Sequence, residues 1–289
     1  MCIKQKGIIY MGLLSGLESF GIQLKDGLEN NLFEKKADTS TNREPDKVES
    51  PKIKESDLLF QKEFACPVCE TKFKHPSLRG GKVRFLGTDM DLKPNYEMVE
   101  PLKYDIISCP YCGYTAVLKY FPSAMSYEKK EIKEKISPTY TAPPFIHNEV
   151  YSYDDALLLY KLGLACSIVK KAHDSEKAYT AMKTGWLIRC MKQEEKDSDK
   201  QAELNRLETE YLKAAKEGFV LARQKESFPI AGMDESSLDY LICILAYEVE
   251  DYQTSLKLMS DLLTSQKTPK KIKDKLYDLK EQLKSKCTN

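Results

Sequence analysis

Residues 150–289 carry apolar side chains at intervals of three and four positions, the spacing that places them on one face of a helix. The pattern predicts six helices joined by short links. Ser152-x-x-Asp155 and Ser198-x-x-Gln201 are typical of capping boxes, and Thr268-Pro269 is typical of an N-cap followed by proline in the first turn. We place the helices at 152–171, 176–192, 198–221, 236–250, 252–263 and from 268 toward the end of the chain.

Small residues recur along these helices and permit close helix crossings. Because short links favour antiparallel neighbours, we expect residues 150–289 to stack helix pairs as a tetratricopeptide-like domain. A generic helical bundle is the alternative, since the match to that repeat's consensus is loose. The small residues are Gly163, Ala165, Ala181, Gly185, Ala214, Ala215, Gly218 and Ala246.

Residues 61–122 change to short runs rich in β-branched and aromatic residues. Val83–Leu86, Tyr104–Ile107 and Tyr114–Tyr120 predict three strands, with Gly80-Gly81 as a break before the first. Residues 123–149 follow as one helix, at about 127–136, and a proline-rich connector. The fold class is therefore α+β and mostly α: a small β domain followed by a helical domain.

The first sixty residues contribute less to a core. In residues 1–33, Leu13, Leu17, Phe20 and Leu24 share one face of a short helix. Its glycines make it a poor autonomous helix, so it is expected to form by docking on the chain's own body, or else on a partner or a membrane surface. Residues 34–60 are polar and predict a linker.

The composition narrows the class of protein. With 42% apolar and 31% charged residues, the chain is typical of a soluble protein with a sizeable core. A net charge of +1 gives no overall attraction to nucleic acid or membrane. Nine cysteines in 289 residues do not indicate a disulfide scaffold, and no run approaches the ~20 apolar residues of a membrane-spanning helix. We expect a protein of the reducing cytoplasm.

Two Cys-x-x-Cys knuckles carry the clearest chemistry. Cys66-Pro67-Val68-Cys69 and Cys109-Pro110-Tyr111-Cys112 offer four soft thiolates in two pairs, a ligand set that suits tetrahedral Zn²⁺. Two unconnected turns, a disulfide pair or a redox Cys-x-x-Cys are the alternatives, but two knuckles of equal spacing favour one metal site. Four thiolates leave no position open for water, so the sequence predicts structural zinc at Cys66, Cys69, Cys109 and Cys112.

The knuckles also differ from a standard zinc ribbon. Gly113 can take positive φ after the second knuckle, whereas Glu70 stands at the matching place after the first and makes a less favourable turn. The interval between Cys69 and Cys109 is about twice the usual one, which predicts an elaborated ribbon sheet.

No catalytic motif accompanies the metal site. His75 is expected to be a solvated loop histidine rather than a group supporting the first knuckle. Asp89 and Asp91 share a face and suit a divalent cation or a basic partner group, although turn chemistry is the favoured interpretation. No phosphate-binding glycine loop or nucleophile motif is present, so we expect a protein that is not an enzyme.

Nucleic acid is the rival partner. The stretch 72–84 holds five basic side chains and Phe73, with Phe85 directly after it, and has no acidic residue. Residues 61–122 as a whole are nevertheless nearly balanced in charge. We therefore favour a zinc-binding protein-interaction scaffold or adaptor over a zinc-ribbon nucleic-acid-binding protein. The basic residues are Lys72, Lys74, Arg79, Lys82 and Arg84.

These motifs together resemble an uncharacterised bacterial family, domain of unknown function 2225. The resemblance rests on the two knuckles and on the stretches 16–21, 89–96, 101–105, 160–162, 186–189 and 228–235. It implies a zinc-ribbon-like head on a tetratricopeptide-like body, and it supplies no activity. Glu70 and the absence of a glycine before Tyr252 depart from the family pattern.

Overall fold

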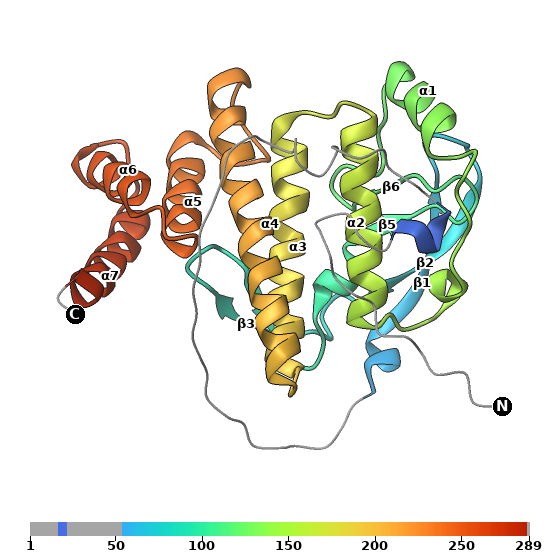
Figure 1. Cartoon of the computed structure of the whole chain (residues 1–289), viewed down its shortest axis with the longest axis horizontal. Coiled ribbons are helices and arrows are strands. Elements are labelled where there is room, and N and C mark those ends of the chain that lie inside the picture. The colour runs from blue at the N-terminus through green and yellow to red at the C-terminus, as the bar shows by residue number, and fades with distance from the viewer. Residues whose placement is uncertain (1–16, 22–53, 288–289) are drawn as a thin grey trace.

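The computed structural model describes residues 17–21 and 54–287. Helices dominate the part of the chain after residue 122, while three short hairpins form most of the part before it (Figure 1). The helices are α1 (Ser126–Lys135), α2 (Tyr153–Val169), α3 (Asp174–Glu194), α4 (Ser198–Lys225), α5 (Glu235–Glu248), α6 (Tyr252–Thr264) and α7 (Lys270–Cys287). The mostly helical α+β class is confirmed.

The helix starts follow the capping rules in part. Ser152 Oγ accepts the N–H of Asp155, whose carboxylate accepts the N–H of Ser152, so α2 begins with the expected capping box. The capping box predicted at Ser198 is wrong. The Asp197 carboxylate caps α4 instead, because it accepts hydrogen bonds from the N–H groups of residues 199 and 200. The buried hydroxyl of Thr268 has no hydrogen-bond partner and does not cap α7.

The strands form three separate antiparallel hairpins. β1 (Leu59–Ala65) pairs with β2 (Lys72–Leu78), β3 (Phe85–Thr88) with β4 (Pro94–Tyr96), and β5 (Ile106–Ser108) with β6 (Thr115–Val117). The first and third hairpins each enclose one knuckle at their turn. β1 and β2 were not predicted from the sequence, because β1 is mostly exposed and its charged residues hide the alternation.

The β3–β4 hairpin and its loop form an arm that crosses the helices. Met90 and Leu92 pack with α5, α6 and α7, and the Tyr240 hydroxyl donates to the Met90 carbonyl oxygen at 2.8 Å. In Figure 1, β3 lies near α4 and α5, away from β1 and β2. The interval between the knuckles is therefore long because it contains this arm, which packs against the helices. The expectation of an elaborated ribbon sheet is wrong.

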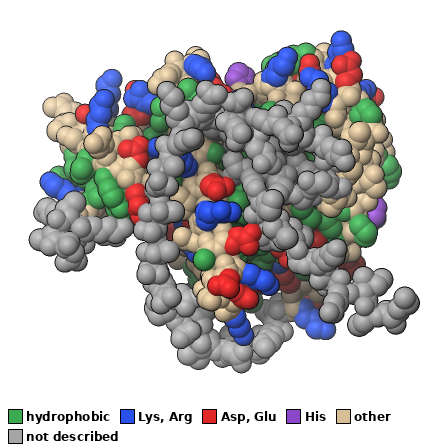
Figure 2. Space-filling model, in the orientation of Figure 1, with side chains coloured by type: hydrophobic (Ala, Val, Ile, Leu, Met, Phe, Trp, Pro, Cys, Tyr) green, Lys and Arg blue, Asp and Glu red, His purple; other side chains and the backbone are tan. Residues whose placement is uncertain are grey.

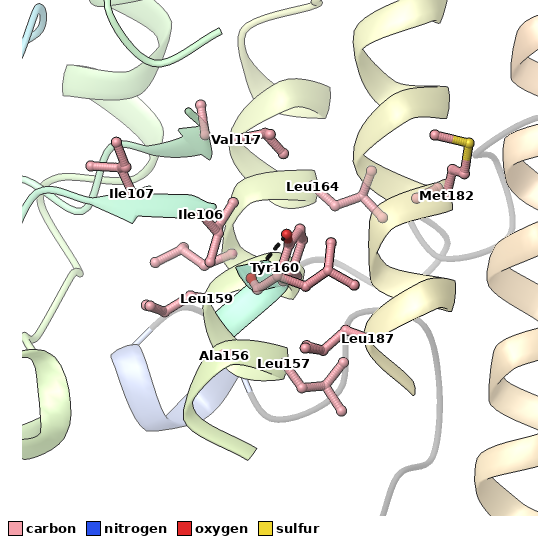
Figure 3. Close-up of a cluster of buried hydrophobic side chains, with 14 of the residues drawn as sticks. Ile106, Ile107, Val117, Ala156, Leu157, Leu159, Tyr160, Leu164, Met182 and Leu187 are labelled. Atoms are coloured by element: carbon pink, nitrogen blue, oxygen red, sulfur yellow. Dashed lines mark hydrogen bonds between the residues drawn. The ribbon is translucent and has the colours of Figure 1, made fainter. Parts of the chain in front are cut away.

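The larger of two hydrophobic clusters runs through the β1–β2 and β5–β6 hairpins and helices α1 to α5, and the second joins α5, α6 and α7. Most of α2 is buried on all sides, because it lies between the β5–β6 hairpin and α3 (Figure 3). A Cβ at Gly163 would meet Ile106 Cδ1 at 2.9 Å, and the Tyr160 hydroxyl donates to the Leu102 carbonyl oxygen at 3.2 Å. The helices of residues 150–289 thus depend on the hairpins for part of their packing.

Residues 17–21 dock on the chain's own body, as expected. Phe20 is fully buried, its ring lies 6.1 Å from that of Tyr140, and its carbonyl oxygen accepts the N–H of Thr141. The 3-10 helix η1 (Leu17–Phe20) is the described part of the predicted N-terminal helix. Leu13, Leu24 and linker residues 34–53 lie outside the described residues.

Within the described parts of the chain, no helix has the length and hydropathy needed to cross a membrane.

Candidate metal centre

Each knuckle is a tight turn at the end of a hairpin. In the first, the N–H of Glu70 donates to the Cys66 carbonyl oxygen at 2.9 Å; in the second, the N–H of Gly113 donates to the Cys109 carbonyl oxygen at 3.0 Å. Both residues have positive φ, +62° for Glu70 and +75° for Gly113. The two turns are therefore equivalent, and Glu70 adopts a conformation that ordinarily favours glycine.

The turns bring all four sulfurs to one point. Cys66 Sγ lies 3.6 Å from Cys112 Sγ, Cys69 Sγ lies 3.6 Å from Cys109 Sγ, and all four atoms lie within 4.8 Å of one another. Sulfurs arranged tetrahedrally about 2.3 Å from an ion are about 3.8 Å apart, whereas disulfide sulfurs are about 2.05 Å apart. The four cysteines are free, so the arrangement suits a metal ion rather than disulfides.

Crowding shifts the pKa values of the thiols in opposite directions. Contacts with Cys109 and Cys112 lower the pKa of the Cys66 thiol to about 2, while contacts with Cys109 and Cys66 raise the pKa of the Cys112 thiol. The cluster therefore shares protons unevenly. A cation bound by the four sulfurs would replace these protons and would stabilise the thiolate form of each cysteine.

The second knuckle is packed directly against the body. The Cys166 thiol of α2 contacts the Gly113 carbonyl oxygen at 3.6 Å, and Ser137 Oγ donates to the Cys112 carbonyl oxygen at 2.9 Å. A Cβ at Gly113 would lie 2.5 Å from Cγ of Tyr140. The centre is thus part of the shared core, and its loss must disturb the helices as well as the hairpins.

His75 is buried in β2, so the expectation of a solvated loop histidine is wrong. Its ring lies between those of Phe64 and Tyr151, and its Nε2 is 3.3 Å from the Tyr104 carbonyl oxygen. Burial lowers the pKa of His75 to about 4. The burial of His75 was not predicted because strand β2 was not recognised in the sequence. In β2 the alternate residues Phe73 and His75 face inward.

His75 predicts an acid-sensitive stability. The pKa of the folded-state imidazole is depressed, so its contribution is present above pH 6.5 and is lost as pH falls toward 4. Between pH 7 and pH 5 we expect the free energy of unfolding to lose about 2 kcal/mol through this group. His75→Gln, which keeps a hydrogen-bond donor without titrating, should remove that loss in urea unfolding curves. Equal losses in both proteins would contradict the assignment.

Asp89 and Asp91 lie in the arm and act within the chain. Asp91 is fully buried and accepts the Trp186 indole N–H at 2.6 Å and an Arg189 N–H at 2.8 Å. Its other oxygen accepts the N–H of Lys93 at 3.2 Å, which is the expected turn chemistry. Among the described residues, only the four cysteines converge closely enough to hold an ion. The aspartates bind a basic group of the chain itself.

Arg189 is the centre of a charge network that the sequence analysis did not find. Besides Asp91, it pairs with Glu208 of α4 at 2.7 Å and with Glu248 of α5 at 3.0 Å, and Asp89 lies at 3.7 Å. Burial raises the pKa of Glu248 to about 8. The network joins the arm to three successive helices. The sequence signal for this network was Arg189 itself, a charged residue on the buried face of α3. Its acidic partners could not be identified, because they lie far away in sequence.

The basic stretch 72–84 is dispersed in the structure. Lys72 pairs with Glu63 at 3.1 Å and Arg84 lies 3.7 Å from Glu97, while Arg79 donates to the Leu59 carbonyl oxygen at 2.8 Å. The positive charge of this segment is thus partly compensated by its neighbours.

Comparison with known proteins assigns a family. The model of a family described as an uncharacterized protein conserved in bacteria, DUF2225, matches residues 59–283. The chain belongs to the DUF2225 family. No curated protein and no solved structure is significantly similar to it.

The DUF2225 match covers every strand, both knuckles and nearly all of the helices. The four-cysteine cluster and the arm therefore lie inside the matched region, whereas η1 precedes it. The resemblance recognised from the motifs is confirmed.

Proposed function

We propose that this DUF2225 protein is a non-enzymatic interaction scaffold of the bacterial cytoplasm, stabilised by one Zn²⁺ ion at Cys66, Cys69, Cys109 and Cys112. Four thiol ligands complete a tetrahedral shell, so the ion supplies structure and not a reactive water. The remaining described cysteines are also free thiols, which suits a reducing compartment.

Zinc is proposed over other ions because tetrahedral four-sulfur sites hold zinc or iron, and zinc is redox-inert. Elemental analysis of the purified protein should give about one zinc per chain. Iron in place of zinc would contradict the choice of ion without affecting the site.

The helices support a tetratricopeptide-like body. Successive helices from α2 to α6 pack against their neighbours in chain order, as repeat helices do. Gly185 lies where a Cβ would meet Leu212 Cδ2 at 2.7 Å, so small residues permit the close approach of α3 and α4. In this proposal the helices present an extended surface that the hairpins enlarge.

The single observation that carries the interaction role is the apolar surface of the hairpins. Phe60 is 39% exposed, Phe85 55%, Leu86 58% and Met98 48%. Large apolar side chains that stay exposed on the β1–β2 and β3–β4 hairpins are typical of surfaces that bind other proteins. Affinity capture of the native protein from its host, with and without nuclease, tests the role: a specific protein partner retained after nuclease treatment is expected.

Nucleic-acid binding through residues 72–84 is the alternative function. Lys74 and Lys82 keep exposed side chains that pair with no carboxylate among the described residues. On the face shown in Figure 2, however, acidic and basic side chains are interspersed and no broad area of one sign is visible. Mixed charge of this kind supports few phosphate contacts.

We therefore expect little binding to short single- and double-stranded DNA or RNA, measured by fluorescence anisotropy at two salt concentrations. Tight binding that weakens steeply with salt and disappears on charge reversal at Lys82 and Arg84 would instead establish the nucleic-acid function.

A further inference from the structure

The inner face of the β1–β2 hairpin is only half covered. Phe73 and His75 of β2 pair with Phe64 and Lys62 of β1, and cross-strand partners share one face of a hairpin. The two β2 residues are buried in the core. Phe60 and Lys62 of β1, on the same face, are exposed. The core thus ends beneath β2 and leaves the β1 half of this face open.

A groove of about 350 Å³ lies along this open half. We call it the β1 groove. It is lined by Phe60, Lys62 and Phe64 of β1 and by residues of β2, β4, β5 and the 3-10 helix η4 (Pro101–Tyr104), together with Lys183 of α3. Tyr96 and Leu118 add partly exposed apolar surface. The groove therefore lies at the junction of the hairpins with the helical body.

Lys62 carries the uncompensated charge of the β1 groove. Its ammonium group lies 5.1 Å from the centre of the Phe64 ring and pairs with no carboxylate of the described residues. The groove's two acidic residues are already paired, Asp105 with Lys183 and Glu100 with Lys93 at 3.2 Å. An occupant with a carboxylate therefore gains an ion pair at Lys62 without displacing an existing one.

The backbone of β1 is also available. Among the described residues β1 pairs only with β2, so its other edge has no strand partner. Exposed strand edges bind extended peptides through main-chain hydrogen bonds, while pockets beside the edge select alternate side chains.

We propose that the β1 groove binds an extended peptide of a partner protein in which alternate residues are apolar, acidic and apolar. Phe60, Lys62 and Phe64 are two residues apart, so their spacing of about 6.8 Å equals that of alternate side chains on a second strand. The acidic residue pairs with Lys62, and the apolar residues cover the two phenylalanines. This inference rests on the proposed interaction role and names the class of partner.

The test uses the full-length, zinc-loaded protein and a displayed library of short randomised peptides. Selection should enrich the alternating apolar–acidic–apolar pattern. Lys62→Glu should weaken the selected peptides at least tenfold in fluorescence anisotropy and should favour versions with lysine in place of the acid. Lys74→Glu is the matched control, because Lys74 is an exposed residue of β2 outside the groove. It should leave binding unchanged.

Several results would overturn the proposal. The proposal is wrong if the selection enriches no peptide pattern, if the enriched peptides show no preference for an acidic residue, or if the Lys62→Glu variant binds the selected peptides as tightly as the wild type. Selection of peptides matching residues 1–53 of this chain would assign the groove to the chain itself. Dimerisation lost in Lys62→Glu would assign it to a second copy. A protein partner captured equally by wild type and Lys62→Glu would reject the groove yet leave the scaffold role intact, whereas capture of no protein partner would reject that role.

Discussion

Replacing one of the proposed zinc ligands should unfold most of the described protein. We expect Cys69→Ser to lose both the zinc and most of the helical circular dichroism signal at 37 °C. Structural zinc contributes about 10–16 kcal/mol in small modules, which is comparable to the whole stability of a domain, about 5–15 kcal/mol. Because Cys166, Ser137 and Tyr140 contact the second knuckle, the loss cannot stay within the hairpins.

Cys243→Ser is the matched control for this prediction. Cys243 lies in α5, and its Sγ is 3.3 Å from the Ser255 carbonyl oxygen, so a serine hydroxyl can donate the same hydrogen bond. The control should keep its zinc and its helical signal. A Cys69→Ser protein that loses zinc but keeps its helices would show that the body folds without the metal centre, contrary to the shared core described above.

The elements that depend on local sequence could be predicted well. The period of apolar residues located α1 to α7, since amphipathic spacing is read within a single helix. The knuckles were equally clear, because two residues between cysteines force both sulfurs to one side of a turn. The convergence of Cys66 with Cys112 then followed from the chemistry of four thiolates.

The features that depend on distant contacts could not be predicted. Asp91 and Trp186 are far apart in sequence, and nothing local marks them as partners. β1 was assigned in part to a linker because its face is only half covered, so its hydrophobic pattern is weak. His75 was misjudged because a histidine beside lysines is typical of a solvated loop, whereas here its strand turns it into the core.

The second large effect is expected at Arg189, which holds the arm against the body. Arg189→Met keeps most of the side-chain volume but leaves Asp91, which is buried, and Glu248, which is partly buried, without their cation. Glu208 keeps its ion pair with Lys192. Breaking a buried ion pair from one side costs about 3–5 kcal/mol. The free energy of unfolding should fall by that amount in urea titrations. Emission of Trp186, the only tryptophan, should shift to longer wavelength as the arm separates from α3.

Arg206→Met provides the comparison, because Arg206 is an exposed arginine of α4 whose ion-pair partner Glu210 has a partly exposed side chain. Exposed pairs contribute about 0–1 kcal/mol, so this variant should remain close to wild type.

The pH dependence of the free energy of unfolding of Arg189→Met distinguishes the loss of charge from the loss of packing. Without the guanidinium, the buried carboxyl groups acquire raised pKa values, as burial already raises that of Glu248 to about 8. A raised folded-state pKa contributes stability at low pH that is lost as pH rises through it. The deficit of Arg189→Met should therefore be smaller at pH 5 than at pH 8. A deficit that does not change with pH would assign the effect to packing and would refute the charge network as the link between arm and body.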